Sequence, residues 1–182
     1  MKKILFIFIF LLSTSEAIAS LKLSIINKLK NVENISFDFE QNINGKIENG
    51  NCVIKYPKKI NCKYQQSNKK ILVSNGKSLV IKTLSSYYIY PLKKTPLYLI
   101  LNKNFLLNKI KSLKERKIQN KFVNFNFKEN ENEINLFFDV KTYNLVGWQT
   151  IDIYQNVSIT YLSSIRRNQK LNEGLFLLPK EN

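Results

Sequence analysis

Cys52 and Cys62 are the only two cysteines in this sequence of 182 residues, and they flank one short Tyr-Pro-Lys-Lys turn. Such thiols could bind a metal, act as nucleophiles or form a disulfide. A metal site is disfavoured, because two thiols without any histidine leave a tetrahedral shell incomplete. The absence of histidine also removes the base of a serine or cysteine triad. A disulfide and a pair of buried free thiols that pack as small hydrophobes both remain.

The residues around the cysteines predict a β-hairpin. If the two arms pair about Pro57, Cys52 lies opposite Cys62. Because side chains alternate between the faces of a strand, one face is then apolar and the other largely polar. The first face carries Cys52, Ile54, Tyr56, Ile60, Cys62 and Tyr64, and the second carries Asn51, Val53, Lys55, Lys59, Asn61 and Lys63. Directly opposed Cα atoms lie about 4.5 Å apart, so we expect a disulfide in an oxidising compartment.

The N-terminus indicates such a compartment. Two lysines precede the apolar run Ile4 to Leu12, and Ala17-Ile18-Ala19 follows as an A-x-A cleavage motif. This is the order of a secretory signal peptide. The alternative is an uncleaved anchor, but the run is shorter than the roughly 20 apolar residues that span a bilayer. We expect residues 1–19 to be a signal peptide and residues 20–182 to form one exported domain.

Strand-like alternation recurs along the chain, with no helix expected between most of the segments. Asn75-Gly76 is a strong hairpin signal. Four further segments place three apolar side chains on one face: Ile35, Phe37 and Phe39; Val123, Phe125 and Phe127; Ile134, Leu136 and Phe138; and Val157, Ile159 and Tyr161. Strands joined by Asn- and Gly-rich turns predict one antiparallel sheet with an unusually aromatic face.

Two segments break the strand pattern. Residues 20–32 have apolar side chains at helical spacing, with Ser20 as a possible cap. Residues 97–113 carry a second apolar stripe, with an interruption expected near Asn102. Each helix must bury its stripe, and the aromatic face of the sheet is the available surface. We therefore expect an α+β fold, with a single curved antiparallel β-sheet and helices covering its concave apolar face.

The formal net charge is +16, from 29 Lys and Arg against 13 Asp and Glu. For an exported protein this charge points to phospholipid headgroups, proteins or wall polymers rather than nucleic acid. Codon bias towards Lys, Asn and Ile explains the charge equally well. A basic cluster on the second helical segment could dock on an anionic membrane, although solvated helix charge is the interpretation we prefer. Its members are Lys103, Lys109, Lys111, Lys114, Arg116 and Lys117.

The sequence lacks the patterns that enzymes and cofactor-binding proteins need. It has no histidine and no Gly-rich phosphate loop, and the acidic turn Glu129 to Glu133 lacks the spacing of a calcium loop. We therefore expect neither catalysis nor a bound cofactor or metal.

The order of these features resembles the LolA family of periplasmic outer-membrane lipoprotein carrier proteins. The matching pieces are Phe39-Glu40-Gln41, Gly50 with Tyr56-Pro57 and Tyr64, Ser74-Asn75-Gly76-Lys77, Tyr90-Pro91, Thr95-Pro96-Leu97, and Phe176 to Pro179. The resemblance implies an incomplete β-barrel lidded by helices, with an apolar cavity for lipoprotein acyl chains. It also implies a periplasmic protein, expected to be a monomer. Its partners would be outer-membrane lipoproteins, an inner-membrane lipoprotein-releasing ABC transporter and an outer-membrane acceptor.

The resemblance separates three related roles. The acceptor has a similar fold but is lipid-anchored through a cysteine, and no cysteine follows the apolar run here, which favours the carrier. A sensor or adaptor that binds lipoprotein or lipid without transport remains the alternative.

The expected lipid-binding residues come from the hairpin, the strand before it and the second helical segment. They are Phe37, Phe39, Ile54, Tyr56, Ile60, Tyr64, Leu97, Ile100 and Leu101. For each one, ordinary core packing is the alternative. Carriers of this family commonly have an arginine immediately before the hairpin proline, where it helps to latch the lid. Here that residue is Tyr56, which can hydrogen-bond through its hydroxyl but supplies no charge.

Overall fold

The structure, a computed structural model, describes residues 21–65, 68–129, 131–151 and 155–181. Within them, one 11-stranded antiparallel sheet runs in the order β6-β5-β4-β3-β2-β1-β11-β10-β9-β8-β7. The elements are α1 (Leu21–Lys30), β1 (Asn34–Ile43), β2 (Lys46–Lys55), β3 (Lys59–Tyr64), β4 (Ile71–Asn75), β5 (Ser78–Lys82), β6 (Tyr87–Pro91), the 3-10 turn η1 (Leu92–Lys94), α2 (Leu97–Ile100), α3 (Lys103–Ser112), β7 (Arg116–Ile118), β8 (Phe122–Glu129), β9 (Asn132–Asp139), β10 (Leu145–Ile151), β11 (Val157–Arg167) and η2 (Glu173–Phe176). The predicted signal peptide and Ser20 lie outside the described residues.

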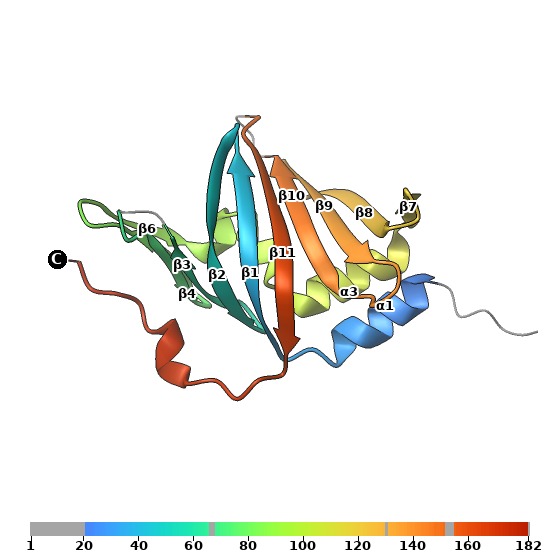
Figure 1. The fold of residues 1–182 in the computed structure, drawn as a ribbon, viewed down its shortest axis with the longest axis horizontal. Helices are drawn as coiled ribbons and strands as arrows, with labels where there is room; N and C mark the ends of the chain where they lie inside the picture. Colours follow the sequence, from blue (N-terminus) through green and yellow to red (C-terminus); the bar gives the residue numbers. More distant parts are fainter. Residues whose placement is uncertain (1–20, 66–67, 130, 152–154, 182) are drawn as a thin grey trace, which may run out of the picture.

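Helices cover one side of this sheet, as predicted. Figure 1 shows α3 behind β10 and β9, and α1 next to it at the lower end of the same half of the sheet. Phe105 of α3 packs edge-on against Phe127 of β8, with ring centroids 5.8 Å apart. Strands β6 and β7 are the two edges, so the sheet is curved but open. No helix in the described ranges has the length and apolar character needed to cross a bilayer.

The second helical segment is interrupted at the predicted place. The four-residue α2 ends at Ile100, and α3 starts at Lys103. Between them, the Asn102 side chain accepts a hydrogen bond from the Phe105 backbone N–H at 3.3 Å. Asparagine is a favoured N-cap because its oxygen satisfies a free N–H of the first turn. The cap therefore makes α2 a short element separate from α3.

The predicted hairpin register is confirmed. Cys52 pairs with Cys62, and Ile54 pairs with Ile60. The two cysteines form a disulfide, with their Cα atoms 4.1 Å apart. The alternative of two free thiols is therefore excluded in the structure.

The apolar triplet recognised in β11 lies on the outward face of the sheet. Its inward side chains are Thr160 and Leu162, which pair with Gln41 and Phe39 of β1. Val157, Ile159 and Tyr161 consequently lie on the outward face, and Tyr161 is 53% exposed. Alternation identifies a strand but does not say which of its two faces meets the core.

A C-terminal strap, residues 172–180, covers part of the outward face. Figure 1 shows it running from the end of β11 across to the side of β3 and β4. Asn61 of β3 donates a side-chain hydrogen bond to the Leu175 carbonyl at 2.7 Å. Phe176 is buried, as are the outward Val73 and Val80, and all three lie outside the main core cluster. The strap thus creates a second, smaller apolar cluster.

Candidate functional site

A cavity of about 220 Å³ lies between the concave face of the sheet and α2. Strands β1 to β5, β10 and β11 provide its walls, and α2 with the two residues before it provides its roof. The lining residues are Phe39, Gln41, Cys52, Ile60, Cys62, Tyr64, Leu72, Leu79, Thr95, Pro96, Leu97, Ile100, Trp148, Thr150, Ser158 and Thr160. A concave site with mostly apolar walls and a few polar groups suits a ligand with hydrocarbon parts.

Gly50 makes room for the aromatic wall of this cavity. Phe39 and Tyr64 pack edge-to-face, with ring centroids 5.0 Å apart. A Cβ at Gly50 would lie 2.7 Å from the Phe39 ring and would also collide with the Lys63 carbonyl oxygen. A residue with any side chain at this position would therefore displace Phe39 or the β2–β3 pairing.

One wall of the cavity is polar and internally hydrogen-bonded. The Tyr64 hydroxyl donates to Gln41 Oε1 at 3.1 Å. The Gln41 amide donates in turn to Ser158 Oγ at 3.2 Å and to Thr160 Oγ1 at 3.1 Å. Burial raises the pKa of Tyr64, and the nearby Glu48 raises it further, so Tyr64 stays a neutral donor. This network fixes the orientation of the polar wall.

A buried ion pair lies beside the same wall. Lys70 Nζ is 2.5 Å from Glu48 Oε2 and 4.1 Å from the centre of the Tyr64 ring. Glu48 is only 4% exposed. A buried carboxylate needs such a partner, because removing one member leaves an uncompensated charge. Loss of Lys70 would therefore leave the Glu48 carboxylate with less compensation for its burial.

The roof is tied to the rest of the fold on either side of Asn102. Before it, the Leu101 carbonyl accepts a hydrogen bond from the Lys58 backbone N–H at 2.9 Å. After it, Lys103 Nζ donates to the carbonyl of Lys30, the last residue of α1, at 3.1 Å and to that of Val32 at 2.9 Å. Cations at a helix C-terminus are favourable because they meet its free carbonyls.

Tyr56, the residue before the hairpin proline, is buried close to this second tie. Its backbone N–H donates to the Glu33 carbonyl at 2.9 Å, and Lys103 Nζ lies 6.0 Å from its ring centre. Burial raises the pKa of Tyr56, so the side chain is neutral. Lys103 thus places a positive charge close to the neutral Tyr56 side chain.

The predicted lipid-binding residues fall into two groups. Phe39, Ile60, Tyr64, Leu97 and Ile100 line the cavity. Phe37, Ile54, Tyr56 and Leu101 do not line it, although all nine residues belong to the core cluster or pack against it. Alternation correctly placed the strand residues of the second group on the inward face. It could not show that other side chains fill that part of the face.

Several lining residues were not predicted from the sequence. Gln41 lies two residues after Phe39, so strand alternation already placed it on the same face. Leu72 and Leu79 flank the recognised Asn75-Gly76 turn. Trp148 and Thr160 had no usable signal, because their contribution depends on which strands neighbour β1. No cluster of three metal-ligating side chains occurs among the residues described.

The comparison with sequence families decides the classification. Residues 30–178 match the family described as outer membrane lipoprotein carrier protein LolA. This chain belongs to the LolA family. The match spans every strand of the sheet and every residue that lines the cavity. No curated protein sequence matches the chain.

Solved structures with the same architecture are distant in sequence. An uncharacterized conserved protein from Thermus thermophilus superposes with a TM-score of 0.53 at 9% identity, covering 88% of this chain and 93% of that one. A LolA superfamily protein from Nitrosomonas europaea gives 0.45 at 7% identity, covering 85% and 96%. The Pseudomonas aeruginosa MucA/MucB complex gives 0.48 at 10% identity, covering 88% and 61%. The Thermus likeness supports the fold alone.

Proposed function

We propose that this protein is a periplasmic carrier that moves lipoproteins from the inner to the outer membrane. The observation that carries the proposal is the apolar cavity beneath α2 in a member of the LolA family. Each methylene kept from water is worth about 0.8 kcal/mol, so a lipoprotein's acyl chains need shelter in an aqueous compartment. The disulfide, Phe39, Trp148 and Leu97 offer an apolar lining of that kind.

The size of the cavity implies that the roof moves. At about 220 Å³ it is smaller than the usual ligand pocket, which spans about 300–1,000 Å³. A multi-chain lipid anchor would therefore enter only if α2 lifted from the sheet. The short α2, capped off from α3 at Asn102, suits such a displacement.

The remaining features of the proposal follow from the carrier role. Residues 20–182 would be the exported carrier domain after removal of a signal peptide. An inner-membrane ABC transporter would supply lipoproteins, and an outer-membrane acceptor would receive them. The protein would work as a monomer without catalysis, because transfer of acyl chains between apolar sites requires no covalent chemistry.

The direct test adds the purified protein to spheroplasts of its host and measures lipoproteins released into the supernatant. We expect release as a soluble complex. Leu97→Asp places a charge in the roof and should abolish release, whereas Leu177→Asp, at a site 74% exposed on the strap, should not. Absence of release by the folded wild type, with a functional transporter verified, would overturn the carrier role. Lipoprotein binding without release would instead favour the sensor or adaptor.

A role of Lys103 in holding the roof closed can be tested by placing a second positive charge next to it. Tyr56→Arg places a second cation next to Lys103, so it should weaken roof closure and lower release. Adding Lys103→Met removes that repulsion, and we expect the double variant to recover part of the lost release. If the double variant is no better than Tyr56→Arg alone, Lys103 has no latch role.

A further inference from the structure

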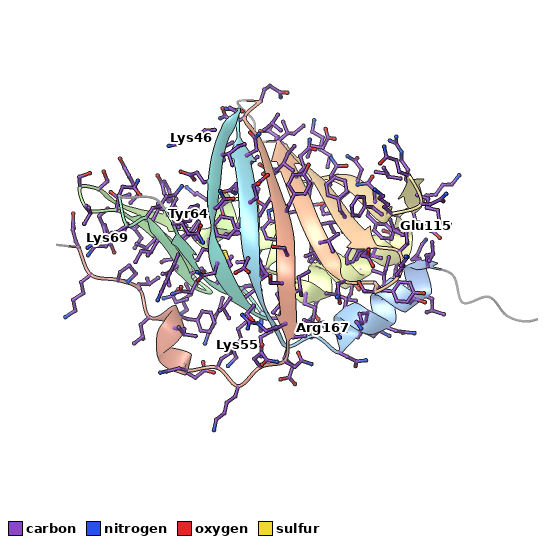
Figure 2. The ribbon with its side chains drawn as sticks, viewed as in Figure 1. Lys46, Lys55, Tyr64, Lys69, Glu115 and Arg167 are labelled. Carbon is purple, nitrogen blue, oxygen red and sulfur yellow. A yellow bond between two sulfur atoms is a disulfide. The ribbon has the colours of Figure 1, made fainter. Side chains whose placement is uncertain are left out.

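One half of the sheet carries only basic charge in its sequence. From Asn49 to Lys114 the chain contains lysines but no aspartate or glutamate. This stretch includes β3 to β6, α2 and α3. In Figure 2, Lys69 lies on the β6 side of the molecule, while Glu115, the next acidic residue, lies on the opposite side near β7. The C-terminal strap brings Glu173 to Lys55 and Lys59, so this half carries an excess of positive charge, and such an excess attracts an anionic surface.

Exposed apolar side chains gather on the edge strand of the same half. Tyr88 is 52% exposed, Ile89 55% and Tyr90 43%. The Tyr88 and Tyr90 rings stack with centroids 6.5 Å apart and planes 18° apart. In the described ranges β6 pairs only with β5, so the backbone on its other side has no strand partner there. A row of apolar side chains on an open edge marks an interaction surface.

Lysines stand at the end of this aromatic row. Lys93 and Lys94 follow β6 directly in η1, and Lys77 is held beside them by a hydrogen bond from the Leu92 N–H to the Lys77 carbonyl at 2.9 Å. All three side chains are exposed. Within the described part of the chain, no carboxylate lies within ion-pair distance of them.

The basic cluster around α3 is a weaker candidate. Lys109 Nζ pairs with Glu129 at 2.7 Å. Lys103 is engaged by backbone carbonyls near α1. Exposed apolar side chains of the kind seen on β6 are also absent from the described residues of α3.

We propose that the β6 rim, Tyr87–Lys94 together with Lys77, docks on a membrane surface that contains anionic phospholipid. Tyrosine rings favour the headgroup level of a bilayer, and lysines next to them bind anionic headgroups. The unpaired edge backbone confines docking to the hydrated interface, because hydrocarbon does not tolerate free N–H and C=O groups. The contact is therefore shallow and reversible. Strand addition by an acidic protein fits less well, because the edge strand has five residues and ends in Pro91.

The rim is continuous with the cavity. Tyr90 pairs with Leu79, and directly opposed residues of an antiparallel pair share a face. Leu79 lines the cavity. Docking through Tyr90 thus brings the cavity side of β5 towards the headgroups. This docking goes beyond the carrier role and does not require it.

The test measures how much of the protein sediments together with lipid vesicles. The protein is purified from the soluble exported fraction of its host. Vesicles of equal parts phosphatidylglycerol and phosphatidylcholine should bind it, pure phosphatidylcholine should not, and raised salt should weaken binding. Lys93→Glu with Lys94→Glu should lower the partition coefficient at least about tenfold. Lys117→Glu with Lys121→Glu is the matched control, because it makes the same charge change at exposed residues beside β7 and should have little effect.

A second pair of variants separates aromatic docking from bulk charge attraction. Tyr88→Ser with Tyr90→Ser should also weaken vesicle binding, whereas Tyr161→Ser, at an equally exposed residue of β11, should not. Equal losses from both lysine pairs would overturn the proposal, since binding would then follow net charge alone. The proposal would also be overturned if the wild type did not bind anionic vesicles. That holds equally if the rim binds an acidic protein instead of the vesicles.

Discussion

The two halves of one sheet use their concave faces differently. On the β7–β10 half, α1 and α3 lie over the sheet and aromatic side chains fill the space. Phe125 and Phe138 are fully buried there, edge-to-face at 5.9 Å. On the half that contains β1 to β5, the single turn of α2 leaves a cavity of about 220 Å³, which extends as far as Trp148 and Thr150 at the edge of the filled half. The space over the first half is filled by side chains, whereas a cavity remains over the second.

The difference follows from helix length rather than from the strands. Apart from the polar wall around Gln41, the inward residues are mostly apolar in both halves, but α3 has ten residues and α2 has four. A short helix cannot cover a curved sheet closely, so space remains beneath it. A disulfide and the C-terminal strap reinforce the half that lacks a long helix.

The largest loss of stability is expected from a substitution in the packed half of the sheet. Phe138→Ala removes a side chain that is 1% exposed and should lower the free energy of unfolding by about 3–5 kcal/mol. Phe137→Ala, on the outward face of the same strand, is the matched control and should cost clearly less. Urea unfolding measures both. Similar losses in the two variants would show that the two faces of β9 are not packed differently.

The second largest loss of stability is expected when the disulfide is removed. It closes a loop with a sequence separation of 10, so Cys52→Ala with Cys62→Ala should lower the free energy of unfolding by about 2–3 kcal/mol. The reduced wild type should lose a similar amount in the same measurement. If neither loses stability, the disulfide does not reinforce the cavity half.

The smallest effect concerns the strap. Hydrogen bonds from Lys55 and then Lys59 hold the pKa of Glu173 below its usual value. Figure 2 places Lys55 at the end of β2 that the strap passes. Because the pKa of Glu173 is lower in the folded state, its carboxylate contributes its full stabilisation of the strap at a pH above the ordinary carboxyl pKa. That stabilisation is lost as the pH falls through the lowered pKa.

Amide exchange at Phe176 and Leu177 measures this dependence. Exchange protection in the wild type should fall on acidification, and in Glu173→Gln it should be lower at neutral pH and less dependent on pH. The same acid-induced change in both proteins would exclude Glu173 as its source.

The local parts of this account could be predicted from the sequence. The Cys52–Cys62 register followed from alternation, since shifting it by one residue would bury the lysines. The helix break followed from Asn102. The LolA family was predicted from ordered motifs, and the family match confirms it.

The cavity boundary could not be predicted, because it depends on contacts between distant elements. Phe37 and Phe39 alternate identically in the sequence, yet only Phe39 lines the cavity. Phe37 packs against Trp148, with ring centroids 6.2 Å apart. The strap was missed because Lys55, Lys59 and Asn61 looked like an ordinary solvated face, and their partners lie more than 100 residues away.

The decisive measurement uses Trp148, the single tryptophan of the chain, which lines the cavity and is 6% exposed. A lipopeptide with brominated acyl chains should quench Trp148 fluorescence, because bromine quenches only on close approach, while the unbrominated lipopeptide should not. Leu97→Asp should abolish the quenching. If the brominated lipopeptide remains bound through gel filtration and Trp148 is not quenched, acyl chains do not occupy this cavity and the central claim is wrong.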